Sequence, residues 1–288
     1  MCYESLSEYF KRIYGKRLRK ICIDGGFTCP NRDGRCGEGG CIFCGDRGAG
    51  EHIDPTISIR EQVEAGLSRA GDDDLFVAYF QNFTNTYAPT DVLKERYDAA
   101  LIDKRIRVLA IGTRPDCIDE QIAALIASYK ERCDVWIELG LQTASDEVGR
   151  VINRGYDADC FGRAVDILSA HGIPVVAHMI IGLPGEGKAE ALRTAEFLNR
   201  YELFGLKIHS IYVMRGTRLA EMYERGEFVP PTREEYIDTA VSVIKAMRPG
   251  TVIHRLTGDC PRGMLVAPEW STDKNGIIAE IRKRLGKG

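Results

Sequence analysis

The chain has 288 residues, of which 44% are hydrophobic and 28% are charged. These proportions are typical of a globular protein with enough apolar side chains for a sizeable core. Residues 1–20 are charged and amphipathic, unlike a secretory signal, and the longest strongly apolar run, at 173–184, is too short to span a bilayer. We therefore expect a cytoplasmic protein with no membrane partner.

The formal net charge of −3 is distributed unevenly along the chain. Residues 1–20 and 274–288 each carry an excess of basic side chains, whereas the middle of the chain is acidic. Basic ends on an acidic body can attract a polyanion such as RNA, but most charge runs are only solvated faces. The pattern is therefore a weak indication of a nucleic-acid partner.

Apolar runs of strand length alternate with amphipathic stretches of helical spacing. A short helix is expected at about 5–14, and strands are expected at 19–24, 74–80, 107–112, 134–142, 173–182 and 206–214, with a late candidate at 251–258. Continuous apolar strands separated by helices predict a parallel sheet covered by helices. Because no GxGxxG follows the first strand, the pattern favours an α/β fold with a partial (β/α)6 TIM-like barrel over a dinucleotide-binding fold.

The predicted barrel occupies residues 19–215. A short basic helical segment at 1–18 precedes it, and a helical extension at 216–288 follows and closes the barrel. Polar side chains stand near the ends of the predicted strands, at 81–87, 112–116, 138–143, 178–186 and 209–215. In a parallel barrel these carboxyl ends meet at one rim, where we expect the chemistry.

Ten cysteines are many for a cytoplasmic chain, and five of them lie between Cys22 and Cys44. Cys41 and Cys44 form a CxxC pair, and Cys29 lies upstream across a Gly-rich loop. Thiolates normally hold Fe–S clusters, and a cluster with three such ligands keeps one iron open for a small molecule. The rival interpretation is a structural zinc site that uses Cys36 as a fourth ligand. The position of the loop after the first barrel strand favours the cluster, whereas a packed thiol is the simpler interpretation of Cys22.

Cys-Pro-Asn at 29–31, a Gly-rich loop and Cys-Ile-Phe-Cys at 41–44 resemble the radical S-adenosylmethionine (SAM) superfamily. More narrowly, they resemble the branch of the catalytic subunit of elongator and the bacterial YtqA/YhcC-type proteins, in which a long gap precedes the CxxC. Further matches lie at 81–89, 112–116, 138–142, 178–186, 255–259 and 268–270. The resemblance therefore covers nearly the whole chain.

The resemblance implies that Cys29, Cys41 and Cys44 hold a [4Fe–4S] cluster and that Cys36 is not a ligand. From their places near strand ends, His178 and Glu138 are candidate catalytic groups, and a hydrogen-bonded core histidine is an equally good interpretation of His178. The residues implied in cofactor binding are Phe43, Gln81, Thr84, Asn85, Thr113, Glu138, Gln142, Gly182 and Leu183. The 81–85 segment stands where many members have a Gly-Gly-Glu motif that meets the methionine amino group, so its role departs from the common pattern.

We therefore expect an enzyme that cleaves SAM reductively to a 5′-deoxyadenosyl radical, with electrons from a donor such as flavodoxin or ferredoxin. The expected substrate is a tRNA wobble-uridine side chain, because the related elongator subunit acts there and both ends of this chain are basic. The chain has no counterpart of that relative's acetyltransferase half, so the same carboxymethyl-forming reaction is not expected. The alternatives are a radical enzyme for a small metabolite or porphyrin-like substrate, and a zinc-stabilised RNA-binding protein.

Overall fold

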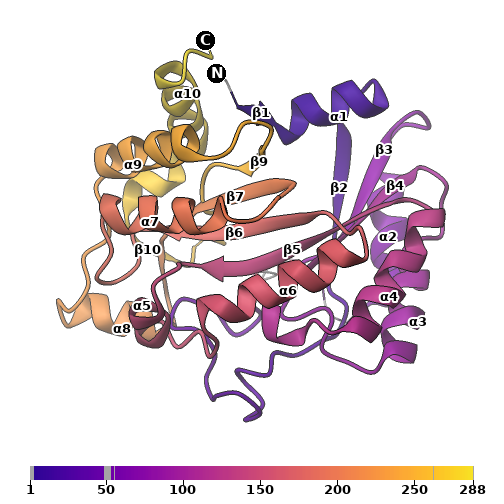
Figure 1. The fold of residues 1–288 in the computed structure, drawn as a ribbon, viewed down its shortest axis with the longest axis horizontal. Helices are drawn as coiled ribbons and strands as arrows, with labels where there is room; N and C mark the ends of the chain where they lie inside the picture. The colour runs from indigo at the N-terminus through magenta and orange to yellow at the C-terminus, as the bar shows by residue number, and fades with distance from the viewer. Residues whose placement is uncertain (1–2, 49–52, 55, 262, 288) are drawn as a thin grey trace.

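The centre of the computed structural model, which describes residues 3–48, 53–54, 56–261 and 263–287, is a curled sheet of eight parallel strands (Figure 1). Their order in the sheet is β1-β9-β7-β6-β5-β4-β3-β2. The strands are β1 (Glu4–Ser5), β2 (Leu18–Ile23), β3 (Leu75–Phe80), β4 (Ile106–Thr113), β5 (Asp134–Gln142), β6 (Val175–Ile181), β7 (Gly205–Ser210) and β9 (Val252–Arg255). Because β2 to β7 are neighbours in chain order, the predicted partial barrel is confirmed.

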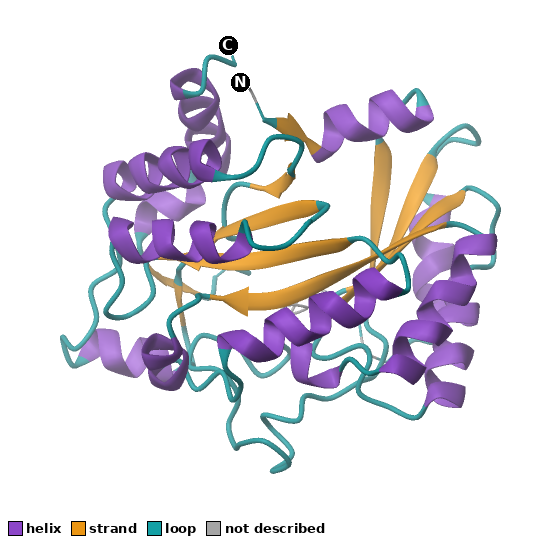
Figure 2. Ribbon diagram, viewed as in Figure 1, coloured by secondary structure: helices purple, strands orange, loops and turns teal. Residues whose placement is uncertain are grey.

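Helices cover the outer face of the sheet (Figure 2). The helices of the described residues are α1 (Leu6–Tyr14), α2 (Ile59–Ser68), α3 (Thr90–Ala100), α4 (Glu120–Ser128), α5 (Asp146–Val151), α6 (Ala158–Ala170), α7 (Lys188–Leu198), α8 (Arg218–Glu224), α9 (Arg233–Ala246) and α10 (Lys274–Arg284), of which α2, α3, α4, α6, α7 and α9 cover this face. Outward strand residues such as Phe80, Ile111 and Leu139 are fully buried in the main core beneath these helices. The continuous apolar runs in the sequence reflect strands that are buried on both faces.

The helix α1 packs instead against the inner face of the sheet. It begins at a capping box in which Ser5 and Glu8 satisfy each other's backbone N–H groups. Its Phe10 is buried and stacks on Trp136, near the start of β5, with ring centroids 6.2 Å apart. Val77 and Val108 belong to the same inner cluster. The helix therefore fills the barrel interior near the amino ends of the strands, and the carboxyl ends stay open for a site.

The C-terminal part of the chain joins the sheet as well as closing it. The late strand candidate is confirmed as β9, which pairs in parallel with β7 and β1. The single strand expected at 206–214 is instead two, because the chain leaves the sheet after Ser210 and β8 (Val213–Met214) pairs with β10 (Leu265–Ala267). The domain boundaries at 18 and 215 stay a prediction. Among the described residues, no helix has the length and apolar character needed to cross a membrane.

Candidate active site

A cavity of about 660 Å³ opens at the carboxyl ends of the strands. Every strand from β2 to β7, together with β9, contributes at least one lining residue. The cysteine loop between β2 and α2 forms one wall, and side chains that point inward from β3, β5 and β7 form the floor. This is the edge of a parallel barrel where active sites lie.

The wall of the cavity carries the three cysteines of the predicted cluster. Cys29, Cys41 and Cys44 all line the cavity as free thiols. A hydrogen bond from Cys41 lowers the pKa of Cys44 to about 7, and the cationic side chains of Arg32 and Arg114 act in the same direction. The same hydrogen bond, together with burial, raises the pKa of Cys41 well above its usual value, so the setting favours the thiolate, which is the metal-binding form, at Cys44.

The cysteine loop folds back on itself through Arg32. Its Nη2 donates to the carbonyl oxygens of Gly45 at 2.5 Å and Cys44 at 3.4 Å. Gly40 has φ of 73°, and a Cβ there would lie 2.9 Å from Arg32 Nε, so the turn before Cys41 requires glycine. The amide N–H of Gly40 donates to the Asn31 carbonyl at 2.8 Å. These contacts fix the thiols to one side of the cavity.

The turn between α5 and α6 holds the loop from the other side. Asn153 adopts φ of 53°, and its Nδ2 donates to the carbonyls of Gly40 at 2.7 Å and Glu38 at 3.1 Å. Asn31 Nδ2 returns a bond of 2.5 Å to the Asn153 carbonyl and lies 3.8 Å from Cys41 Sγ. The loop is thereby tied to the segment that follows β5.

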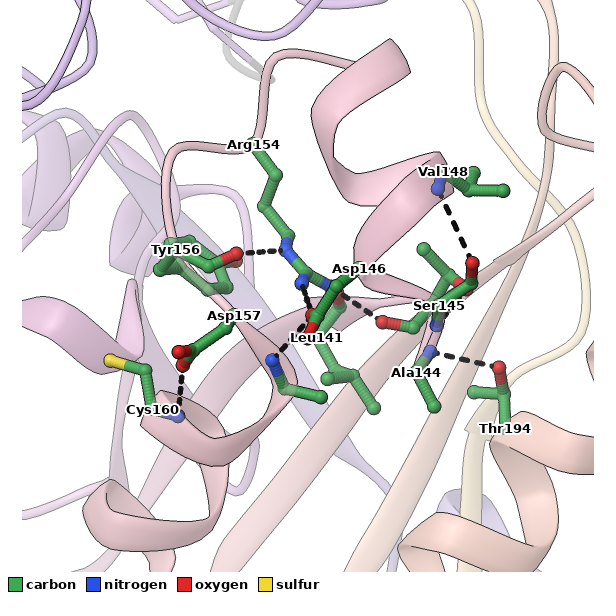
Figure 3. Close-up of polar contacts among 12 residues, drawn as sticks. Leu141, Ala144, Ser145, Asp146, Val148, Arg154, Tyr156, Asp157, Cys160 and Thr194 are labelled. Carbon is green, nitrogen blue, oxygen red and sulfur yellow. Dashed lines mark hydrogen bonds and ion pairs between the residues drawn. The ribbon is translucent and has the colours of Figure 1, made fainter.

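Arg154 anchors that turn from inside the protein (Figure 3). Its side chain is fully buried and donates to the carbonyls of Leu141 at 2.9 Å, Thr143 at 2.5 Å and Tyr156 at 2.8 Å. Its Nη2 also lies 2.9 Å from a carboxylate oxygen of Asp146. Arg154 was not predicted from the sequence, although Asn-Arg-Gly after a short helix indicates a tight turn.

The floor of the cavity is a buried charged network. Glu138 forms an ion pair with Lys207, which is only 2% exposed, and Glu138 Oε2 lies 3.0 Å from His178 Nε2. Lys207 Nζ also donates to Tyr79 OH at 3.0 Å. Burial lowers the pKa of His178 to about 4 and that of Lys207 to about 7. Burial alone would raise the pKa of Glu138, but the Lys207 ammonium holds it well below its usual range.

The structure brings most of the predicted site residues together. The cavity lining includes Phe43, Gln81, Thr84, Thr113, Glu138, Gln142 and His178 beside the three cysteines. Asn85 lies behind the rim, where its Nδ2 donates to the Gly112 carbonyl at 2.7 Å. Gly182 and Leu183 line a second cavity of about 580 Å³ on the outside, beside Glu186. The roles assigned to these residues stay predictions. Tyr79 and Lys207 also line the cavity and were not predicted from the sequence.

Cys36 lies outside this lining, and its exposed thiol interacts with Asp116. Within the described ranges, no group of three or more His, Cys, Asp or Glu side chains is arranged to hold a single metal ion. An iron–sulfur cluster places its thiolates on separate irons, so its ligands lie farther apart than those of one zinc ion. Three thiols on one wall, with Arg32 and Arg114 to offset their charge, fit a three-ligand cluster.

Comparisons with known proteins agree with this geometry. Residues 31–198 match the Radical SAM superfamily, and residues 204–287 match the Radical_SAM C-terminal domain. YtqA of Bacillus subtilis is 34% identical over 98% of this chain and 89% of its own length, and YhcC of Escherichia coli is 36% identical over 96% and 90%. The tRNA uridine(34) acetyltransferase of Methanocaldococcus infernus is 30% identical over 63% of this chain and 34% of its own length.

Solved structures show the same fold. The archaeal Elp3 of Methanocaldococcus infernus superposes with a TM-score of 0.68 at 19% identity, covering 93% of this chain and 63% of that one. TsrM of Kitasatospora setae, with cobalamin and a [4Fe–4S] cluster bound, gives 0.56 at 13% identity, with coverage of 96% and 62%. Superfamily members are enzymes that use a [4Fe–4S] cluster and SAM. The chain belongs to the radical SAM superfamily and, within it, to the group that contains YtqA and YhcC.

Proposed function

We propose that the protein binds its [4Fe–4S] cluster through Cys29, Cys41 and Cys44, cleaves SAM reductively there, and modifies a uridine side chain of tRNA. The observation that carries the first part is the wall of three thiols in a single cavity at the carboxyl ends of the strands. The tRNA part is supported by the similarity to the tRNA uridine(34) acetyltransferase over 63% of the chain.

The bound cluster and SAM would supply a 5′-deoxyadenosyl radical that abstracts hydrogen from the substrate. The residues of the chain bind, orient and shield the reactants. Arg32 and Arg114 stabilise the Cys44 thiolate, while Phe43 and Phe83 add apolar surface to the wall and exclude water. Gln142, held at φ of 69° at the end of β5, presents an amide to the cavity for the polar part of SAM.

His178 and Glu138 would act on the floor of the site. At pH 7 the His178 imidazole is neutral, so it can donate or accept a hydrogen bond with a ribose or substrate hydroxyl. Glu138 is 1% exposed and already bound to Lys207 and His178, so its carboxylate orients those two groups. We infer that Glu138 is a positioning residue more than a proton donor.

The basic ends of the chain give less support to tRNA binding than their charge suggests. Many of their side chains form ion pairs, including Arg12–Glu4, Arg19–Asp74, Lys274–Asp259, Arg284–Glu234 and Lys287–Glu8. The α1 helix also packs near the amino ends of the strands, opposite the cavity. Any tRNA that reaches the cavity would therefore contact the rim, not α1.

The test is anaerobic reconstitution with iron and sulfide, reduction with dithionite in place of the natural electron donor, and chromatography for 5′-deoxyadenosine. We expect a brown protein that forms this nucleoside from SAM, and we expect Cys41→Ala to lose both iron and activity. Added tRNA should stimulate the cleavage of SAM. Mass spectrometry should then detect a modified nucleoside in the tRNA. A colourless protein that retains one zinc per chain would refute the cluster. A full cluster with no response to tRNA would refute the substrate and favour a small metabolite.

A further inference from the structure

The part of the cavity formed by β7 and β9 has more positive charge than its own carboxylates offset. Arg255 lines the cavity, and its guanidinium has no hydrogen-bond or ion-pair partner among the described residues. Lys20 and Lys207 lie over the ring of Tyr79, with Nζ 4.5 Å and 4.4 Å from its centroid. Lys20 is exposed and lies outside the lining, so the two cations of this part of the cavity are Lys207 and Arg255, and the buried carboxylate beside them is that of Glu138.

The other carboxylate that lines the cavity, that of Asp259, does not neutralise this excess of positive charge. Asp259 is 58% exposed and pairs with Lys274 at 2.7 Å, at the mouth of the cavity. In the interior, like charges close together are costly unless a counter-charge offsets them. Consistent with this, the pKa of Lys207 is lowered to about 7, mainly by burial and also by the charges of Lys20 and Arg255, against the effect of Glu138.

A hydrogen-bonding group beside these cations is also unsatisfied. His209 Nε2 is buried and has no partner, and the His209 ring lies 5.4 Å from that of His178, centroid to centroid. Burial holds the pKa of His209 well below its usual range, so the neutral ring can present one N–H. Buried polar atoms are normally paired. This nitrogen and the Arg255 guanidinium are therefore available to bind an atom of a ligand.

We infer that Lys207, His209 and Arg255 bind an oxyanion of the substrate, a carboxylate or a phosphate, on the β7–β9 side of the cavity. The inference rests on the proposed function, because it names a group that the substrate of the radical reaction must carry. A guanidinium supplies a planar pair of donors and an ammonium supplies a point charge, and both form strong bonds to oxyanions in water-poor sites. Substrate held in this way would have its neighbouring carbon fixed for hydrogen abstraction.

The test uses inorganic phosphate and acetate as probes on the reconstituted holoenzyme, at constant ionic strength set with sodium chloride. At a tenfold excess over its dissociation constant, the bound probe should raise the melting temperature by about 3 °C. Arg255→Gln should weaken probe binding at least tenfold, and Arg255→Lys should retain part of it. The matched control is Arg163→Gln, an exposed change on α6 that should respond as the wild type does.

The two probes and SAM separate the sources of the oxyanion. A larger response to phosphate assigns a phosphate, and a larger response to acetate assigns a carboxylate. If Arg255→Gln weakens SAM binding as much as probe binding, and SAM displaces the probe, the site belongs to the SAM carboxylate and the inference is wrong. No response of the wild type to either probe also overturns it.

The proposed function and the oxyanion site can fail separately. Probe binding that depends on Arg255, without any effect of tRNA on SAM cleavage, would refute the tRNA proposal and keep the oxyanion site. Modification of tRNA that proceeds unchanged in Arg255→Gln would refute the oxyanion site and keep the tRNA proposal.

Discussion

Replacing Arg154 with methionine tests whether a buried turn supports the cluster loop. The side chain is 0% exposed, and methionine keeps its apolar length while removing every donor. The carbonyls of Leu141, Thr143 and Tyr156 would then lose bonds of 2.9, 2.5 and 2.8 Å. Asp146 would lose an ion pair, but this carboxylate is 53% exposed and water can replace the arginine.

The expected cost follows from the three carbonyls. A hydrogen bond from a charged donor contributes about 1.5–3 kcal/mol, and removing one partner of a buried charged group costs about 3–5 kcal/mol in total. Because some of the carbonyls can rebind water after the turn relaxes, we expect Arg154→Met to lower the free energy of unfolding by about 3–5 kcal/mol. Relaxation would also displace Asn153, whose side chain holds the Gly40 carbonyl at 2.7 Å. Cluster loading should therefore fall as well.

Two measurements check this expectation. Urea unfolding gives the free-energy difference from the shift in midpoint, and iron per chain after reconstitution gives the loading. Arg150→Met is the matched control, because Arg150 is exposed and lies on α5, the short helix just before this turn. It should change stability by no more than about 0.5 kcal/mol. An Arg154→Met protein within about 1 kcal/mol of the wild type, with full iron content, would show that the turn does not depend on this side chain.

Three further changes have defined outcomes. Cys36→Ser should leave iron content and colour unchanged, because the Cys36 thiol interacts with Asp116 outside the cavity; loss of iron would make it a ligand. Phe10→Ala should lower the unfolding free energy by about 3–4 kcal/mol, because Phe10 is only 4% exposed in the inner cluster. The control is Ile13→Ala, also on α1, which should cost well under 1 kcal/mol because Ile13 is 47% exposed. Glu186→Gln should stabilise the protein at pH 8 but not at pH 4.5. Burial raises the pKa of Glu186 to about 7, so its folded form loses stability as pH rises from about 4.5 through 7. Thermal melts against pH, with the exposed Glu196→Gln as control, should show a difference that grows across this window and then levels off.

The strands could be predicted from the sequence because their signal is local. The expected ranges for β2 to β6 agree with the structure to within a few residues, since most of these strands are continuous apolar runs that end in polar residues. The run at 206–214 misled the prediction because it stays apolar after Ser210. Ile211 and Val213 are buried in a second core cluster, so hydrophobicity does not mark where the chain leaves the sheet.

The site could be predicted only in part. The cysteine spacing and the resemblance placed Cys29, Cys41 and Cys44 together, and the rule for parallel barrels placed Glu138 and His178 near them. Lys207 was missed, although successive side chains of a strand point to opposite faces of the sheet. Leu206 and Ile208 point to the main core, so Lys207 between them points into the barrel. Arg154 could not be found by such a pattern, because its partners are backbone carbonyls that come together only after the turn has folded.

The position of Lys207 has a consequence for how the two sides of the cavity depend on each other. Lys207 on β7 and Glu138 on β5 are joined across β6, whose His178 binds the same carboxylate. A ligand that draws the ammonium toward Arg255 would weaken its bond to Glu138 and strengthen the bond from His178. Occupancy of the β7–β9 side would in this way change the hydrogen bonding of His178 on β6. Because the network is buried, such a change in hydrogen bonding would be felt strongly at its neighbours.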